Sequence, residues 1–255
     1  MRKVLTWATA GAIAVTVGLY SASAEAQWGT IKGKVTVSGD FTALKNLVEK
    51  GNKSTKDAEV CAAEDVPNES AVVDPASKGV ANVVVWIASK PAKIHPDLAK
   101  SAKPIVEFDQ KGCRFLPHVL LVRTDQKVKV LSDDNISHNT HTWPRANKQE
   151  NFIVAPKDRV GVVVPSVSIK EKTPTKVTCD IHPWMEAYWL ILDHPYSAVT
   201  NAKGEFEIAN LPVGEHELKV WQEKIGWVEK SMKITVKAGT TELPKMTIAG
   251  SELNK

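Results

Sequence analysis

The residues best suited to chemistry lie in one short stretch that runs from residue 179 to residue 185. It offers a thiolate, an imidazole and a thioether at Cys179, His182 and Met185, with two residues between successive donors. Sulfur and nitrogen donors of this kind suit an ion that alternates between Cu(I) and Cu(II), and a short loop can direct all three at one ion. A second histidine would have to come from elsewhere in the chain.

Other common cysteine sites do not fit this stretch. A c-type haem attachment needs two cysteines before its histidine, a structural zinc site usually has paired Cys-x-x-Cys hooks, and a binuclear copper site needs a second loop cysteine. The stretch has one cysteine, and a chance grouping remains open in a chain with seven histidines and four methionines.

The segment from Ile136 to Trp143 contains two candidates for the missing imidazole, His138 and His141. They are three positions apart, so in an extended segment they face opposite sides of the sheet and cannot both bind one buried ion. We choose His138 because the amide of Asn139 beside it could tie this segment to the Cys179 loop. His141 is then expected to be a half-exposed strand residue.

Residues 1–26 have the three parts of a secretory signal peptide: a basic start, an apolar middle and a small-residue end, with cleavage expected after Ala26. The apolar run is short for a membrane anchor, and no later segment is apolar enough to span a bilayer. Export to the periplasm or beyond implies an oxidising compartment. With Cys179 assigned to the metal loop, Cys61 and Cys113 are left as a candidate disulfide.

The mature chain carries a net charge of about +3 after removal of the signal peptide from a chain of net charge +4. Its lysines are scattered, and no basic run is interleaved with aromatic residues, so nucleic-acid binding is not expected. Some 229 residues are enough for two small β domains or one large one.

Extended patterns recur along the whole mature chain. Ile31, Val35 and Val37 share one parity, which indicates a half-buried strand, while the almost continuous apolar run over 83–87 is typical of a strand buried on both faces. Valine-rich segments follow at intervals of about 8 to 12 residues, separated by turn-forming residues. This spacing predicts an all-β fold of antiparallel sandwiches.

Two motifs in this order resemble the type 1 blue-copper proteins, the cupredoxins. The first runs from Phe115-x-Pro117 to Asp134-x-x-x-His138-Asn139, and the second is Cys179-x-x-His182-x-x-Met185, with Pro183 after the histidine as in amicyanin. The resemblance implies a Greek-key β-sandwich over 103–192 holding one copper ion. The implied ligands are His138, Cys179, His182 and Met185, with Asn139 and Pro183 in supporting positions.

The C-terminal segment, from Thr200 through Asn210-Leu211-Pro212-Val213-Gly214 to Val220, resembles the carboxypeptidase regulatory-like, prealbumin-type β-sandwich. That resemblance implies a second sandwich made of residues 27–102 and 193–255, with the cupredoxin domain inserted or packed beside it. An irregular excursion would occupy the polar stretch over 61–79, and a Cys61–Cys113 disulfide would connect the two domains.

The cupredoxin resemblance implies an electron carrier and not an enzyme. Its transient partner would be a cytochrome or periplasmic dehydrogenase, docking on an apolar patch that includes Ile181 and Trp184, with His182 as the exposed edge. Further copper sites are not expected, because the remaining histidines form no cluster in the sequence; His118, His141 and His194 have no assigned role. The alternative is an exported β-sandwich binding or scaffold protein with a copper-storage or structural metal site.

Overall fold

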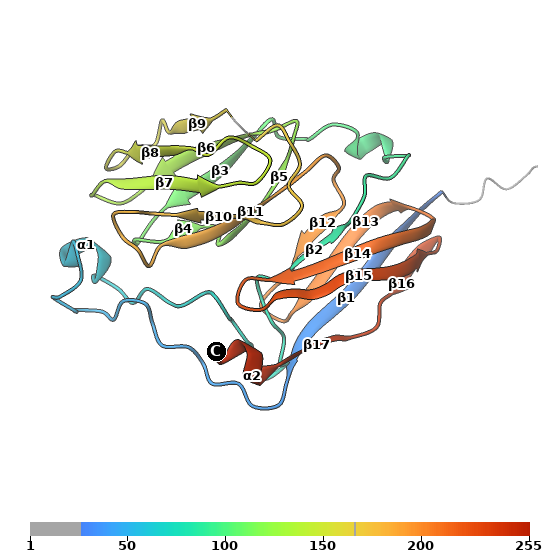
Figure 1. The fold of residues 1–255 in the computed structure, drawn as a ribbon, viewed down its shortest axis with the longest axis horizontal. Coiled ribbons are helices and arrows are strands. Elements are labelled where there is room, and N and C mark those ends of the chain that lie inside the picture. The colour runs from blue at the N-terminus through green and yellow to red at the C-terminus, as the bar shows by residue number, and fades with distance from the viewer. Residues whose placement is uncertain (1–26, 166) are drawn as a thin grey trace, which may run out of the picture.

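The computed structural model describes residues 27–165 and 167–255, and almost all of the regular secondary structure over them is β-strand (Figure 1). The all-β prediction is therefore confirmed. The expected signal peptide, residues 1–26, lies outside the described residues. Within those residues, none of the helices has both the length and the apolar character needed to cross a membrane.

Two sheets built from the first two strands and the last six pack face to face, and we call them the terminal sandwich. One sheet contains β13 (Glu205–Pro212), β1 (Trp28–Ser38) and β16 (Gly239–Glu242), with β17 (Met246–Ala249) also paired to β1. The other contains β12 (Ser197–Val199), β2 (Val84–Ile87), β14 (Gly214–Gln222) and β15 (Gly226–Val236). The predicted parity of β1 is confirmed, because Ile31, Val35 and Val37 are all buried in the core between these sheets.

The strands between residues 105 and 192 form a second pair of sheets, the central sandwich. One sheet has the order β5 (Val119–Arg123), β11 (Glu186–Leu192), β10 (Thr175–Thr178), β7 (His138–Trp143) and β8 (Asn151–Val154). The other has the order β4 (Phe115–Leu116), β3 (Ile105–Gln110), β6 (Lys127–Ser132) and β9 (Val162–Val164). Phe108 lies at the centre of the core between them, stacked on Phe115 and edge-on to Trp189.

The two sandwiches meet at β2, whose four residues are all buried. Val85 and Ile87 face the core of the terminal sandwich, while Val84 and Trp86 pack against Leu190 and other apolar residues of β5 and β11. A strand with apolar neighbours on both faces gains from an uninterrupted apolar sequence. This contact explains the apolar run seen at 83–87.

The described helical turns are short: α1 (Ala58–Cys61), the 3-10 turn η1 (Pro96–Leu98) and α2 (Gly250–Leu253). The connection from β1 to β2, residues 39–83, carries α1 away from these two strands and places it beside the central sandwich (Figure 1). A disulfide between Cys61 and Cys113 fixes α1 there, and Cys61 is buried in the core of the central sandwich. The excursion that begins at the terminal sandwich thus reaches the same end of the central sandwich as the Cys179 loop.

Candidate metal centre

The strand register brings the two sequence motifs together. In the antiparallel pair β7–β10, His141 lies opposite Thr178, so Asn139 falls opposite Asp180, just beyond the end of β10. His138 is the first residue of β7, and Cys179 is the first residue after β10. Two adjacent strands therefore present an imidazole and a thiol at the same edge of the sheet.

The loop from Cys179 to Met185 is closed by its own main chain. The Cys179 N–H donates to the Met185 carbonyl at 3.1 Å, and the Met185 N–H donates to the His182 carbonyl at 2.9 Å. These bonds form a tight turn that directs the side chains of Cys179, His182 and Met185 into the protein, where all three are buried. The structure thus buries the three donors of the loop between the end of β10 and the start of β11.

Three donor atoms come close enough to hold one ion. The side chains of His138, Cys179 and His182 each contribute one atom, and these atoms lie within 4.8 Å of one another. His138 Nδ1 is 3.0 Å from His182 Nδ1, and Cys179 Sγ is 3.8 Å from His182 Nδ1. Met185 is buried in the same apolar cluster as Cys179.

The pKa shifts in this cluster favour a thiolate beside a protonated imidazole. Burial raises the pKa of Cys179, but hydrogen bonds from His138 and His182 outweigh it and lower the pKa to about 6. Burial likewise opposes protonation of His138, yet the Asp134 carboxylate and Cys179 give it a net raised pKa. Two imidazole lone pairs 3.0 Å apart repel unless a proton or a metal ion lies between them. A metal ion bound by these two nitrogens and by the Cys179 sulfur could take the place of a proton between the Nδ1 atoms.

Each imidazole is held from behind by a carboxylate. Asp134 Oδ2 lies 2.9 Å from Nε2 of His138, and Asp57 Oδ2 lies 2.9 Å from Nε2 of His182. Carboxylates at the distal nitrogen fix the ring orientation and leave the other nitrogen free to bind a metal. Both Nδ1 atoms accordingly face the thiol.

Asn139 ties β7 to the Cys179 loop. Its Oδ1 accepts from the Asp180 N–H at 2.7 Å and lies 3.3 Å from both the Ile181 N–H and Cys179 Sγ. Its Nδ2 donates to Asp180 at 3.0 Å and to Asn151 at 2.9 Å. One buried amide therefore fixes the loop relative to the strand that carries His138.

His141 lies on the other face of β7, as its position in the strand predicts. Its Nδ1 is 3.1 Å from the Asp180 carboxylate, its Nε2 contacts Gln149, and its ring stacks on Trp143 with a centroid distance of 3.9 Å. His141 is not among the residues that gather around Cys179.

The exposure of the loop differs from the expectation. His182 is fully buried, so the prediction that it forms an exposed edge is wrong. Ile181 and Trp184 are half-buried and Pro183 is exposed. The indole of Trp184 packs against Val48, Ala62 and Val66 of the β1–β2 connection, and its Nε1 donates to the Cys113 carbonyl at 3.2 Å. The difference arises because the β1–β2 connection covers this side of the loop.

Cys113 lies close to the candidate centre but is not a ligand. Its sulfur forms a second donor group with Asp134 and His138, and that sulfur is used in the disulfide with Cys61. The disulfide joins residues 52 positions apart. This disulfide attaches residues 39–83 to the central sandwich within a few ångströms of His138.

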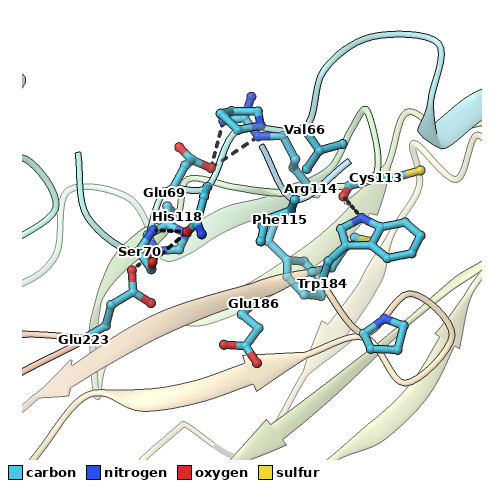
Figure 2. Close-up of a pocket in the computed structure, with 15 residues that line it drawn as sticks. Val66, Glu69, Ser70, Cys113, Arg114, Phe115, His118, Trp184, Glu186 and Glu223 are labelled. Atoms are coloured by element: carbon cyan, nitrogen blue, oxygen red, sulfur yellow. Dashed lines mark hydrogen bonds and ion pairs between the residues drawn. The ribbon is translucent and has the colours of Figure 1, made fainter. Parts of the chain in front are cut away.

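A cavity of about 290 Å³ adjoins the loop on the side of Trp184 and Met185 (Figure 2). Its polar walls are already paired, with Arg114 2.8 Å from Glu69 and His118 2.6 Å from Glu223. Burial opposes a charge on His118, but Glu223 raises its pKa overall. Because His118 directly precedes β5 and Glu223 directly follows β14, this ion pair connects the two sandwiches. His118 thus acts in the contact between them.

His194 is a buried residue at the end of β11. The Tyr196 N–H donates to its Nδ1 at 3.3 Å. Burial lowers the pKa of His194 to about 4, so the ring is neutral near pH 7. His194 lies outside the groups of described residues that could hold a metal.

The carboxylates of Asp134 and Asp57, which hold the two imidazoles, were not predicted from the sequence. Asp134 could have been found, since it lies four residues before His138. Asp57 left no signal, because it belongs to a polar stretch and is 125 positions from His182.

A scan against models of protein families finds no match, and a search of curated proteins finds none. Solved structures of copper proteins are similar to part of the chain at low identity. A purple cupredoxin from Nitrosopumilus maritimus is 16% identical with a TM-score of 0.27, over 34% of this chain and 98% of its own. Amicyanin from Paracoccus versutus is 14% identical with a TM-score of 0.28, over 42% and 96%.

A copper-containing nitrite reductase from Thermus scotoductus is 16% identical with a TM-score of 0.27, over 42% of this chain. The match spans only 25% of the length of that enzyme.

Proposed function

We propose that the protein is an exported type 1 copper protein that carries single electrons. The observation that carries the proposal is the meeting of two imidazole Nδ1 atoms and one thiol of lowered pKa in a fully buried cluster. Thiolate and imidazole donors suit copper, and such a donor set would serve both of its oxidation states without large rearrangement. Bound there, one copper ion per chain would supply reversible one-electron chemistry.

In this proposal His138, Cys179 and His182 would hold the ion, and Met185 would supply a weaker thioether donor. Asn139 and the loop main chain keep these side chains in one arrangement, so that little would have to move between oxidation states. The apolar surroundings of Cys179 and Met185 exclude water from the site.

We propose the periplasm as the compartment, on the basis of the signal-peptide pattern at residues 1–26. The disulfide between Cys61 and Cys113 fits an oxidising environment. The partner would be a soluble redox protein, such as a cytochrome or a periplasmic dehydrogenase, that binds transiently near the exposed Pro183 and the half-buried Ile181.

We also propose a division into a cupredoxin domain over 103–192 and a regulatory-like domain formed by 27–102 and 193–255. The strand pairing supports it, since the strands before 103 and after 192 pair only with one another among the named strands. In this division residues 39–83 reach out from the regulatory-like domain to the copper domain.

The test is electron exchange by the copper-loaded mature protein with a periplasmic c-type cytochrome, followed by stopped-flow absorption. The proposal predicts that the protein reduced with ascorbate passes one electron per chain to the oxidised cytochrome and keeps its copper through repeated cycles. A Cys179→Ser variant loaded with copper is the matched control and should exchange far more slowly. Retention of copper without exchange, or its release on reduction, would favour the storage or scaffold alternative.

A further inference from the structure

The β1–β2 connection is built to reach the candidate metal centre. The disulfide holds it at Cys61, and an internal β-bridge joins its own residues Val48 and Val66. Trp184 packs against that bridge, so the connection and the Cys179 loop share one apolar contact. The part of the connection between these anchors is therefore fixed relative to the loop.

Asp57 is the residue that this fixed segment directs at the loop. It precedes α1, a position at which an aspartate side chain ordinarily accepts a hydrogen bond from the first turn of the helix. Here the side chain makes no such bond, and the backbone is in the left-handed region with φ of 52°. Its Oδ2 lies instead 2.9 Å from His182 Nε2.

The carboxylate lies between His182 and solvent. The His182 side chain is 0% exposed, whereas the Asp57 side chain is 40% exposed. The Nε2–H of His182 therefore faces a carboxylate and not water. Asp134 makes the same bond to His138 but is itself buried.

We propose that Asp57 is a positioning residue for the metal centre, supplied by a segment outside the central sandwich. It keeps the proton of His182 on Nε2, directs the Nδ1 lone pair toward Cys179 and His138, and closes the imidazole edge to solvent. This inference rests on the proposed copper site. Its negative charge favours the more highly charged Cu(II) over Cu(I), so it also sets the balance between the two oxidation states.

The covering of His182 Nε2 by Asp57 restricts the route that electrons could take to a partner. A partner cannot contact the imidazole of His182 directly while Asp57 covers its Nε2 edge. Electrons leaving through His182 would pass the Asp57 carboxylate or the adjoining loop residues.

The first test uses the mature protein without metal. Proton and nitrogen NMR of the histidine rings should show an Nε2–H resonance of His182 that is protected from exchange with water. Asp57→Ala should lose that protection, and Asp57→Asn should weaken it. Glu59→Gln is the matched control, since Glu59 is an exposed carboxylate of α1 that is not a hydrogen-bond partner of His182, and it should behave like the wild type.

The second test is competitive titration of Cu(II) and Cu(I) into the same proteins. We expect Asp57→Asn to lower the affinity for Cu(II) about 10-fold to 100-fold, with a smaller effect on Cu(I), so that the reduction potential rises. Far-ultraviolet circular dichroism of each variant checks that the sheets are retained.

The two proposals fail in different ways. If the wild type binds no copper through its thiolate, the proposed function fails, and the NMR experiment still decides whether Asp57 holds His182. If the wild type binds copper but Asp57→Asn and Asp57→Ala match Glu59→Gln in ring protection and in the ratio of Cu(II) to Cu(I) affinity, the role of Asp57 is refuted.

Discussion

Asp134 holds His138 through a carboxylate that is itself fixed by the main chain. Its Oδ2 lies 2.9 Å from His138 Nε2, and the carboxylate also accepts from the N–H groups of Gly112 at 2.6 Å and Cys113 at 2.8 Å. Burial raises the pKa of Asp134, but the bonds from His138 and these amides lower it overall. The carboxylate is therefore ionised near neutral pH and orients the ring of His138.

Replacement of Asp134 with Asn should weaken metal binding. The amide removes the negative charge behind His138, so we expect Cu(II) affinity to fall about 10-fold to 100-fold in a competitive titration. Asp133→Asn is the matched control, because the Asp133 carboxylate pairs with Lys111 and Lys157 at the surface. Equal affinities for the two variants would contradict a supporting role for Asp134.

Removal of the disulfide should release the β1–β2 connection. For a loop of this length, the chain-entropy model gives a loss of about 3 to 4 kcal/mol in the free energy of unfolding. In a Cys61→Ala, Cys113→Ala double variant, trypsin should cleave more rapidly at the exposed lysines nearby, which are Lys50, Lys53 and Lys56. Cleavage at the wild-type rate would show that the packing of Trp184 is enough to hold the connection.

His194 should make the protein less stable in acid. Its pKa is about 4 in the folded protein against an ordinary value of 6.5, so the unfolded chain binds the proton more tightly. This contribution to stability is complete above about pH 6.5 and is lost as the pH falls toward 4, by up to about 3 kcal/mol.

Chemical denaturation of the metal-free protein at several pH values measures that contribution. A His194→Gln variant lacks the titrating group, so the difference in unfolding free energy between wild type and variant should shrink between pH 7 and pH 4. A difference that stays constant over this range would contradict the assignment.

The strands and the donor loop were accessible from the sequence because their signals are local. The parity of Ile31, Val35 and Val37 indicated a buried strand face, and the apolar run at 83–87 indicated a strand buried on both faces. Strand alternation separated His138 from His141, and the neighbouring amide of Asn139 favoured His138. The structure places His138 with Cys179 and directs His141 to the other face.

The surroundings of the loop were not accessible, because they depend on contacts between distant residues. His182 was expected at the surface, but a segment more than a hundred residues earlier buries it. The polar sequence around Asp57 has no hydrophobic periodicity that would indicate packing against the Cys179 loop. Its position is set by the disulfide at Cys61 and the packing of Trp184.

The central claim is that Cys179 is a thiolate ligand of copper, and the visible absorption spectrum of the mature protein during titration with Cu(II) tests it most directly. The account predicts an intense band at ~600 nm from thiolate-to-copper charge transfer. The band should saturate at one copper per chain and be absent from Cys179→Ser. A colourless wild type, or a band that persists in Cys179→Ser, would contradict it.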